Sequence, residues 1–268
     1  IYGDGDDEVW YYQALPTTAT GNGQTYNLQL YYHLPQTLTT ITYFVSDTAK
    51  QDDSYSWDTD VSEEEAIRIQ NTYVQSMLKW NEVYYYSYDE IGNIISNKII
   101  EIREVDNIND ANIVIYPISG QTYVAQTAPI DDPNVVEQNI TTPTNPNNFL
   151  HFHYNQWEMH VNIDQYNESF SLYNILSEFT GQHEMGHVLG LRDVDNLCIY
   201  SPAHHSEILM GYGINTSIHI PYVTYKDIAG VSISRGFHTD EDHKWMKRTN
   251  TDGTIDLICA QCNGVLYD

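Results

Sequence analysis

The stretch GQHEMGHVLGLRDVD, from Gly181 to Asp195, predicts a helix that carries its own stop signal. His183 and His187 are four residues apart, and on a helix this spacing places both imidazole rings on one face, one turn apart. Two imidazoles at that spacing can bind one zinc ion. Glu184, beside the first histidine, can then accept a proton from a zinc-activated water and return it to a leaving amine.

Gly190 is the residue at which the predicted helix ends. A glycine here can adopt the left-handed conformation, so that the chain turns sharply and carries Asp193 back beneath the metal. A catalytic zinc site has three protein ligands and one open position, and His183, His187 and Asp193 would provide the three. The sequence also offers other donors for the third place, namely Asp195, His204 and His205.

The acidic composition restricts the class of partner. Of 268 residues, 37 are Asp or Glu and 11 are Lys or Arg, which gives a formal net charge of -26. Nucleic acids and anionic membranes bind basic patches, so this charge argues against either as the main partner. Apolar residues make up 41% of the chain, enough for a folded core, and no run is long enough to span a bilayer. An acidic surface is also suited to calcium, which is a candidate second cofactor.

Strand and helix patterns alternate along the chain and predict an α+β fold. Strands are predicted at Ile41–Asp47, Asn97–Val105, Ala111–Ile118 and Gly120–Ala128, with one or two more in Phe149–Asp164. Helices are predicted at Ser62–Val83, where Ser62 and Glu65 form a capping box, at Leu172–Gly190, and from Thr224 to Gly230. Residues 129–148 are rich in proline and asparagine and are expected to form a loop.

Three segments are expected along the chain. Residues 1–36 are rich in Tyr, Gly, Thr and Asp, and are predicted to be an irregular N-terminal extension, the remnant of a pro-segment. Residues 37–237 would form the catalytic domain. Residues 238–268 differ in character and are expected to form a small C-terminal segment that resembles a zinc ribbon.

This last segment holds a second set of candidate metal ligands. His238 and His243 precede a CxxC pattern at Cys259 and Cys262, and an Asn-Gly pair follows the second cysteine, as in a zinc knuckle. Two His and two Cys can form a closed, tetrahedral structural zinc site. The chain's three cysteines equally allow one disulfide, either Cys259–Cys262 or Cys198–Cys259, and the sequence leaves both alternatives open.

The segment HEMGHVLGLRD (His183–Asp193) resembles the metzincin zinc-binding consensus HExxHxxGxxH, with Asp in the last place. This variant is similar to the snapalysin branch of secreted bacterial metzincins. EILMGYG (Glu207–Gly213) resembles the methionine turn of the family, with Met210 as its methionine. Met-x-Tyr is the pattern of astacins and serralysins, and the likeness implies that Tyr212 reaches the zinc or the reaction's oxyanion. KWNEV (Lys79–Val83) and TYKDIAG (Thr224–Gly230) resemble matrixins.

The resemblance implies a metzincin-like catalytic domain over roughly residues 37–237, with a twisted mixed sheet over the active-site helix, a methionine turn and a C-terminal helix. It implies that a protein or peptide substrate binds as an added strand along the sheet edge, for which Gly120–Ala128 is the candidate. The expected activity is that of a secreted, extracellular zinc endopeptidase of bacterial origin, acting as a monomer.

The sequence leaves two other functions open. The first is a binding or adhesion protein that is built on a protease fold and has lost activity. Glu184, the residue that inactive relatives most often lose, is present and argues against it. The second is a metal-dependent hydrolase that acts on something other than peptides.

Overall fold

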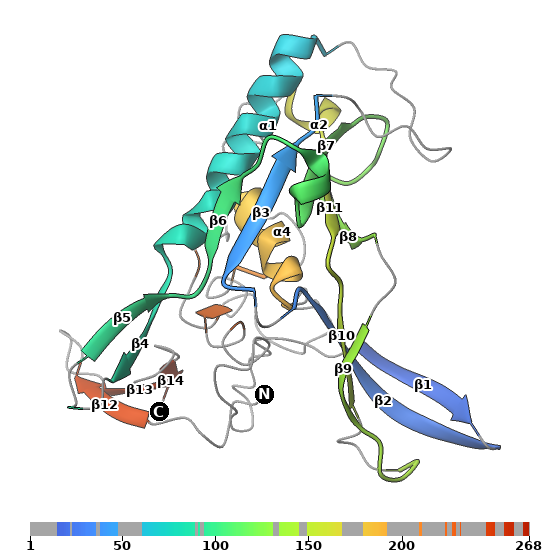
Figure 1. The fold of residues 1–268 in the computed structure, drawn as a ribbon, viewed down its shortest axis with the longest axis vertical. Helices are drawn as coiled ribbons and strands as arrows, with labels where there is room; N and C mark the ends of the chain where they lie inside the picture. Colours follow the sequence, from blue (N-terminus) through green and yellow to red (C-terminus); the bar gives the residue numbers. More distant parts are fainter. Residues whose placement is uncertain are drawn as a thin grey trace.

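The computed structural model describes the following residues: 15–21, 23–35, 38–47, 61–88, 91, 94–130, 134–144, 149–167, 179–191, 209–210, 223, 227–228, 231, 245–249, 255–259 and 265–267. Over these residues the fold is α+β, as the sequence predicts, with a mixed sheet next to two main helices (Figure 1).

A five-stranded mixed sheet forms the centre of the fold. In spatial order its strands are β6 (Glu101–Glu104), β3 (Thr40–Val45), β7 (Ile113–Ile118), β11 (Trp157–Asn162) and β8 (Ala125–Pro129). The first four strands pair in parallel, whereas β8 pairs antiparallel with β11. Among the described strands β8 is therefore an edge strand, which confirms the edge position predicted for Gly120–Ala128, although the strand begins only at Ala125.

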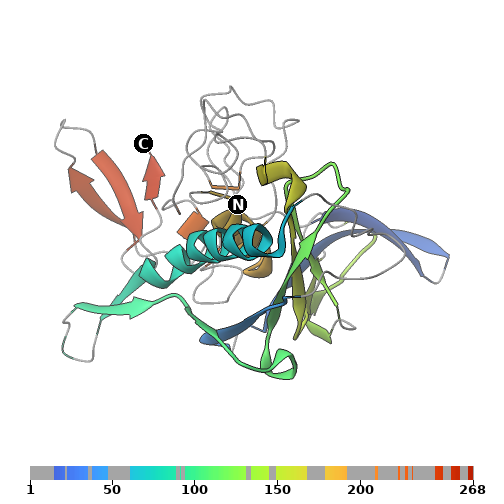
Figure 2. The same ribbon diagram turned by 90° about the horizontal axis from the view of Figure 1, so that it is seen from above.

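Two helices pack together beside this sheet (Figure 2). They are α1 (Glu63–Met77) and α4 (Gly181–Val188). A Cβ on Gly181 would collide with the carbonyl oxygen of Tyr73 and would lie 2.6 Å from the backbone nitrogen of Met77. Glycine therefore lets the two backbones approach closely. The core shared by helices and sheet includes the fully buried side chains of Ile69, Tyr73, Ile115, Met159 and Met185.

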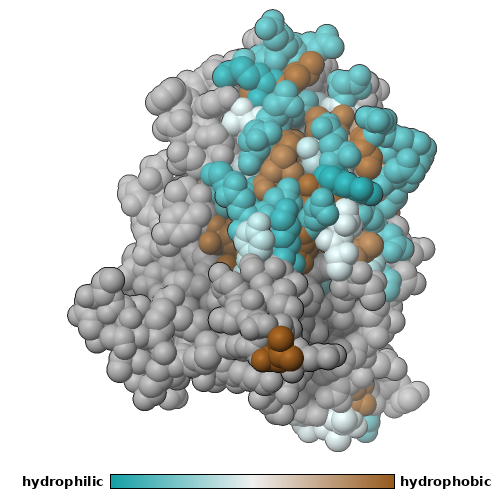
Figure 3. Space-filling model, turned by 60° about the vertical axis from the view of Figure 1, so that its left-hand side comes forward, coloured by the Kyte–Doolittle hydropathy of each residue, from teal (hydrophilic) through white to brown (hydrophobic). Residues whose placement is uncertain are grey.

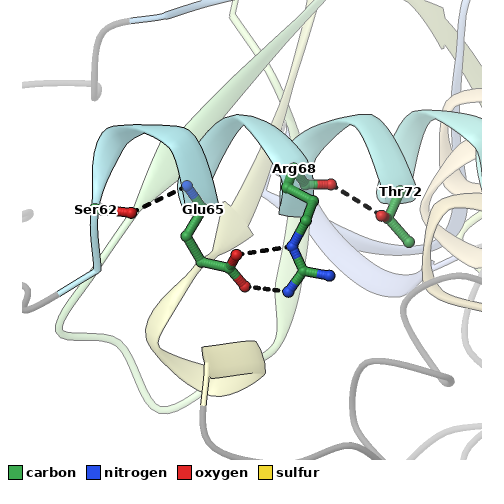
Figure 4. Close-up of polar contacts among 4 residues, drawn as sticks. All are labelled: Ser62, Glu65, Arg68 and Thr72. Atoms are coloured by element: carbon green, nitrogen blue, oxygen red, sulfur yellow. Dashed lines mark hydrogen bonds and ion pairs between the residues drawn. The ribbon is translucent and has the colours of Figure 1, made fainter.

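Helix α1 begins where the sequence predicts. Ser62 is the N-cap, and its hydroxyl accepts a hydrogen bond from the backbone N–H of Glu65 at 3.2 Å (Figure 4). Arg68 forms an ion pair with Glu65, and its Nε donates to Oε2 at 2.7 Å. This hydrogen bond lowers the pKa of the Glu65 carboxyl. After Met77 the predicted Ser62–Val83 helix tightens into a 3₁₀ helix, η2 (Leu78–Glu82), which buries Trp80.

The prediction that residues 1–36 are irregular is wrong for much of that segment. β1 (Leu15–Gly21) and β2 (Gln24–His33) form an antiparallel hairpin, and β2 pairs in parallel with β10 (Phe149–His153). The expected loop at 129–148 is also interrupted, by β9 (Asn134–Asn139), which pairs with β10. These strands form a second, four-stranded sheet because β10 pairs with β2, more than 100 residues earlier in the chain, as well as with β9, and local propensity does not indicate the pairing with β2.

The single strand predicted at Asn97–Val105 is two strands. β5 (Ile94–Lys98) pairs with β4 (Tyr84–Tyr88) in a separate hairpin, and β6 belongs to the central sheet. Between them Ile99 and Ile100 are both buried, so two successive side chains point inward where a continuous strand would alternate. The predicted segment Phe149–Asp164 likewise divides into β10 and β11, which lie in different sheets, and is followed by α2 (Asp164–Asn167).

The described part of the C-terminal segment is a third sheet. β12 (Trp245–Thr249), β13 (Ile255–Cys259) and β14 (Val265–Tyr267) pair antiparallel in sequence order. On the side of the molecule drawn in Figure 3, the described surface is mainly hydrophilic, with small separate hydrophobic areas. Among the described residues, no helix combines the length and the apolar character needed to cross a membrane.

Candidate metal centre

Helix α4 ends at Val188, and a hydrogen-bonded turn at Gly190 closes it. Gly190 has φ 98°, in the left-handed region, and its N–H donates to the carbonyl of His187 at 2.9 Å. The N–H of Leu191 donates to the carbonyl of Gly186, also at 2.9 Å. Together these two bonds form a Schellman motif, which uses carbonyls that the helix end would otherwise leave without partners. The predicted stop at Gly190 is confirmed.

One face of α4 brings three candidate donors together. A ring nitrogen of His183, a carboxylate oxygen of Glu184 and a ring nitrogen of His187 lie within 4.8 Å of one another. The rings of His183 and His187 are 5.0 Å apart and almost perpendicular, and Phe179 packs against the first ring at 5.1 Å. His183 and Glu184 are buried, and His187 is half-buried. The group has the composition and the size to hold a metal ion.

Backbone carbonyls set the orientation of both imidazoles. Nδ1 of His183 lies 3.1 Å from the carbonyl oxygen of Leu209, and Nδ1 of His187 lies 3.0 Å from that of Leu191. A carbonyl oxygen can only accept a hydrogen bond, so each Nδ1 carries the proton and donates. The lone pair is then on Nε2 of each ring. A histidine that a carbonyl partner holds in this tautomer can bind a metal ion through Nε2.

The Leu209 peptide group is held from both sides. Its carbonyl accepts from His183, and its N–H donates to Oδ2 of Asp227 at 3.0 Å. Asp227 is 2% exposed and lies in the region predicted as the last helix. The sequence pattern TYKDIAG contained this aspartate, but nothing in the sequence indicated that its carboxylate would reach the residue before Met210.

Met210 lies against the helix that carries the histidines. A Cβ on Gly186 would collide with the Met210 sulfur and would lie 3.2 Å from its terminal methyl carbon. Met210 is buried, with 1% of its surface exposed. The absence of a side chain at position 186 therefore makes room for the thioether directly beside the turn of α4 that separates the two histidines.

Glu184 has a partner on the edge strand that no sequence pattern indicates. The hydroxyl of Thr127, on β8, donates to Oε2 of Glu184 at 2.6 Å. The two residues are 57 positions apart, and a threonine in a polar strand gives no sign of such a contact. The carboxylate is thus fixed by the sheet edge, while the two histidines are fixed by backbone carbonyls.

Comparison with protein-family models and with curated proteins finds no match to this chain. The residues of the centre and the sequence motifs that contain them therefore carry the functional information.

Several predicted site residues lie outside the described part of the chain. They are Asp193, its alternatives Asp195, His204 and His205, and Tyr212 at the methionine turn. In the C-terminal segment, His238, His243, Cys198 and Cys262 also lie outside it, and Cys259 is described only as the last residue of β13. The third ligand, the tyrosine and the second zinc site remain predictions, as does the choice between metal and disulfide.

Proposed function

We propose that the protein is a zinc-dependent endopeptidase of the metzincin type, in which His183, His187 and Asp193 hold the zinc ion. The observation that carries this proposal is the pair of carbonyl-held imidazoles that flank a buried glutamate on one helix face. The imidazoles of His183 and His187 and the carboxylate of Asp193 form a donor set typical of catalytic zinc. Such a ligand set leaves one coordination position open for chemistry.

In the proposed reaction, bound zinc would act as a Lewis acid that lowers the pKa of a water molecule. The Glu184 carboxylate accepts the proton of that water as it attacks the scissile carbonyl, and afterwards gives a proton to the leaving amine. The Thr127 hydroxyl donates to Oε2 of Glu184, so Oε1 is the oxygen that takes part in this transfer. Tyr212 would donate its phenolic hydrogen to the oxyanion, in keeping with the Met-x-Tyr pattern.

The edge strand supports peptide as the substrate class. Asn162 N–H donates to the Val124 carbonyl at 3.0 Å, and Ile130 N–H to the Gln156 carbonyl at 3.2 Å. Since hydrogen-bonded positions alternate along an antiparallel pair, the backbone groups of Ala125 and Thr127 are directed away from β11. Pro129 is directed the same way but lacks an N–H. A peptide that pairs with this edge would run past Glu184.

The arrangement of elements supports a metzincin-like domain over residues 37–237. A mixed sheet with an antiparallel edge strand packs beside α1 and α4, and a residue of the proposed methionine turn lies against α4. Secretion, a bacterial origin and action as a monomer are proposed from the sequence resemblance, and a role of calcium is proposed from the acidic composition.

The proposal is tested with the full chain as purified. We expect it to carry zinc at the α4 site and to hydrolyse an unfolded, fluorescently labelled protein. Hydrolysis should stop on addition of 1,10-phenanthroline and return when zinc is restored. Zinc binding without any hydrolysis would favour the inactive binding protein. Hydrolysis of small esters but not of peptides would favour a different metal-dependent hydrolase, and a chain that binds no zinc would contradict the proposal altogether.

A further inference from the structure

The contact between Thr127 and Glu184 joins the edge strand β8 to helix α4, and no local sequence feature connects these two elements. Glu184 is 6% exposed, so its carboxylate is largely removed from water. A hydrogen bond of 2.6 Å from a hydroxyl to a carboxylate oxygen is short and of the charge-assisted kind. The bond reaches Oε2, and within the described residues no hydrogen bond reaches Oε1.

Thr127 lies on the strand along which a peptide substrate would pair. Its side chain contacts Glu184, while its own backbone N–H and carbonyl are directed toward the side of β8 on which no described strand pairs. A threonine side chain is stiff at χ1, so the position of the hydroxyl follows the position of the strand backbone. One residue therefore has its main chain where a peptide would pair and its hydroxyl on the proposed general base.

We propose that Thr127 is a positioning residue that couples pairing of a substrate peptide along β8 to the orientation of the Glu184 carboxylate. Pairing with the peptide would restrict the motion of β8. The hydrogen bond from the Thr127 hydroxyl to Oε2 would then fix the orientation of the carboxylate, with Oε1 directed at the attacking water. This inference rests on the proposed peptidase function and adds to it a substrate-dependent alignment of the base.

The kinetic test compares Thr127→Val, which keeps the shape and removes the hydroxyl, with Thr127→Ser, which restores the hydroxyl. With a peptide long enough to pair along β8, Thr127→Val should lose roughly ten- to a hundredfold in kcat. Its KM should change less than about threefold, because the backbone groups that pair with substrate remain. Thr127→Ser should recover most of the lost kcat.

The coupling itself is read from substrate length. In the parent, extending a short peptide so that it covers the β8 edge should raise kcat as well as lower KM. In Thr127→Val the same extension should lower KM only, since the hydroxyl that links strand and base is missing. An equal gain in kcat in both proteins would overturn the coupling.

Thr42→Val is the matched control. Thr42 lies on β3, which β7 and β11 separate from β8 in the same sheet, and its hydroxyl donates to the Asp110 carbonyl at 2.7 Å. We expect this variant to lose some thermal stability and to keep the parent kcat. Equal losses of kcat in Thr42→Val and Thr127→Val would show that the loss comes from sheet stability, and would overturn the proposal. If Thr127→Val does not fold, Thr127→Ala takes its place in each comparison.

A spectroscopic measurement separates failure of this inference from failure of the proposed function. In zinc-free protein, the carboxyl carbon-13 resonance of Glu184 is assigned by its loss in Glu184→Gln. The resonance should move in Thr127→Val and return toward its parent position in Thr127→Ser. An unmoved resonance overturns the inference even in an active enzyme. A parent without chelator-sensitive hydrolysis contradicts the peptidase function instead.

Discussion

Single backbone groups determine how the two histidines can act. The carbonyls of Leu209 and Leu191 hold Nδ1 of His183 and His187, so neither ring can rotate without breaking a buried or half-buried hydrogen bond. Losing such a bond while leaving a buried polar group without a partner costs about 1–3 kcal/mol. The tautomer at each ring is therefore determined by main-chain geometry.

Glu184→Gln tests the proposed general base at this scale. The amide keeps the size of the side chain but cannot accept the proton of water, so hydrolysis should fall by about a thousandfold or more. Zinc content and melting temperature should remain close to those of the parent. Metal analysis, thermal unfolding and turnover on the labelled protein substrate check these outcomes together. Turnover near the parent value would remove Glu184 from the mechanism.

Substitution of Asp193 tests the third ligand. Asp193→Ala leaves two protein ligands and should lose zinc affinity and activity together, whereas Asp193→His should retain zinc and part of the activity. Zinc affinity is measured by competition with a chelating dye. The control changes His204 and His205 to Ala together and should bind zinc as the parent does. The reverse result, with zinc lost only in the control, would assign the third ligand to that pair.

At the scale of elements, two glycines of α4 allow close contacts of different kinds. A side chain at Gly181 would meet the backbone of α1, whereas one at Gly186 would meet the thioether of Met210. Backbone cannot move without shifting a whole helix, but a methionine side chain can change its rotamer. The two sites therefore predict different responses to the same substitution.

Gly181→Ala should destabilise the protein by about 2–3 kcal/mol, because α1 and α4 must separate to accommodate the new methyl group. The gain in helix propensity, about 1 kcal/mol, is smaller than this overpacking and does not offset it. The free energy of unfolding in urea gives the measurement. A change below about 0.5 kcal/mol would show that the helices have room between them.

Gly186→Ala should be relieved by a second change at Met210. The single variants Gly186→Ala and Met210→Ala should each destabilise the protein, the second by about 2–5 kcal/mol because it leaves a cavity. In the double variant the new methyl group occupies part of that cavity, so the total loss should be at least about 1 kcal/mol below the sum. Strict additivity, measured by denaturant unfolding, would mean that the two side chains do not share space.

At the scale of the whole molecule, the described chain contains the central mixed sheet with its helices, a four-stranded sheet that includes the N-terminal hairpin, the β4–β5 hairpin and a C-terminal three-stranded sheet. The last of these is small, and a sheet of three short strands has little core of its own. Such a unit depends on a metal, a disulfide or contacts with the rest of the protein.

Metal analysis shows whether a zinc ion or a disulfide stabilises the C-terminal segment. If His238, His243, Cys259 and Cys262 bind zinc, the parent should carry about two zinc ions per chain. Changing both Cys259 and Cys262 to Ser should remove one ion and leave hydrolysis in place. A single ion in the parent, together with a mass two hydrogens below that of the reduced chain, would instead establish a disulfide.

The sequence predicts those features of the fold and the centre that depend on residues close together in the chain. The Ser62 cap, the alignment of His183 with His187 and the stop at Gly190 each depend on residues within one helical turn of each other, so the pattern alone predicts them. The sequence also predicts the edge position of β8, because a short polar strand is rarely buried on both sides.

The remaining features were decided by tertiary structure. The N-terminal hairpin belongs to a sheet because β2 pairs with β10, more than 100 residues later in the chain, and local composition does not indicate that pairing. The same holds for the contacts that fix the centre: Thr127 reaches Glu184 across 57 positions, and Trp80 donates to the Gln182 carbonyl across 102. Helical periodicity specifies which side chains share a face. Only the register of the sheet and the packing of α1 on α4 specify which distant side chain meets that face, because those contacts depend on the whole chain folding together.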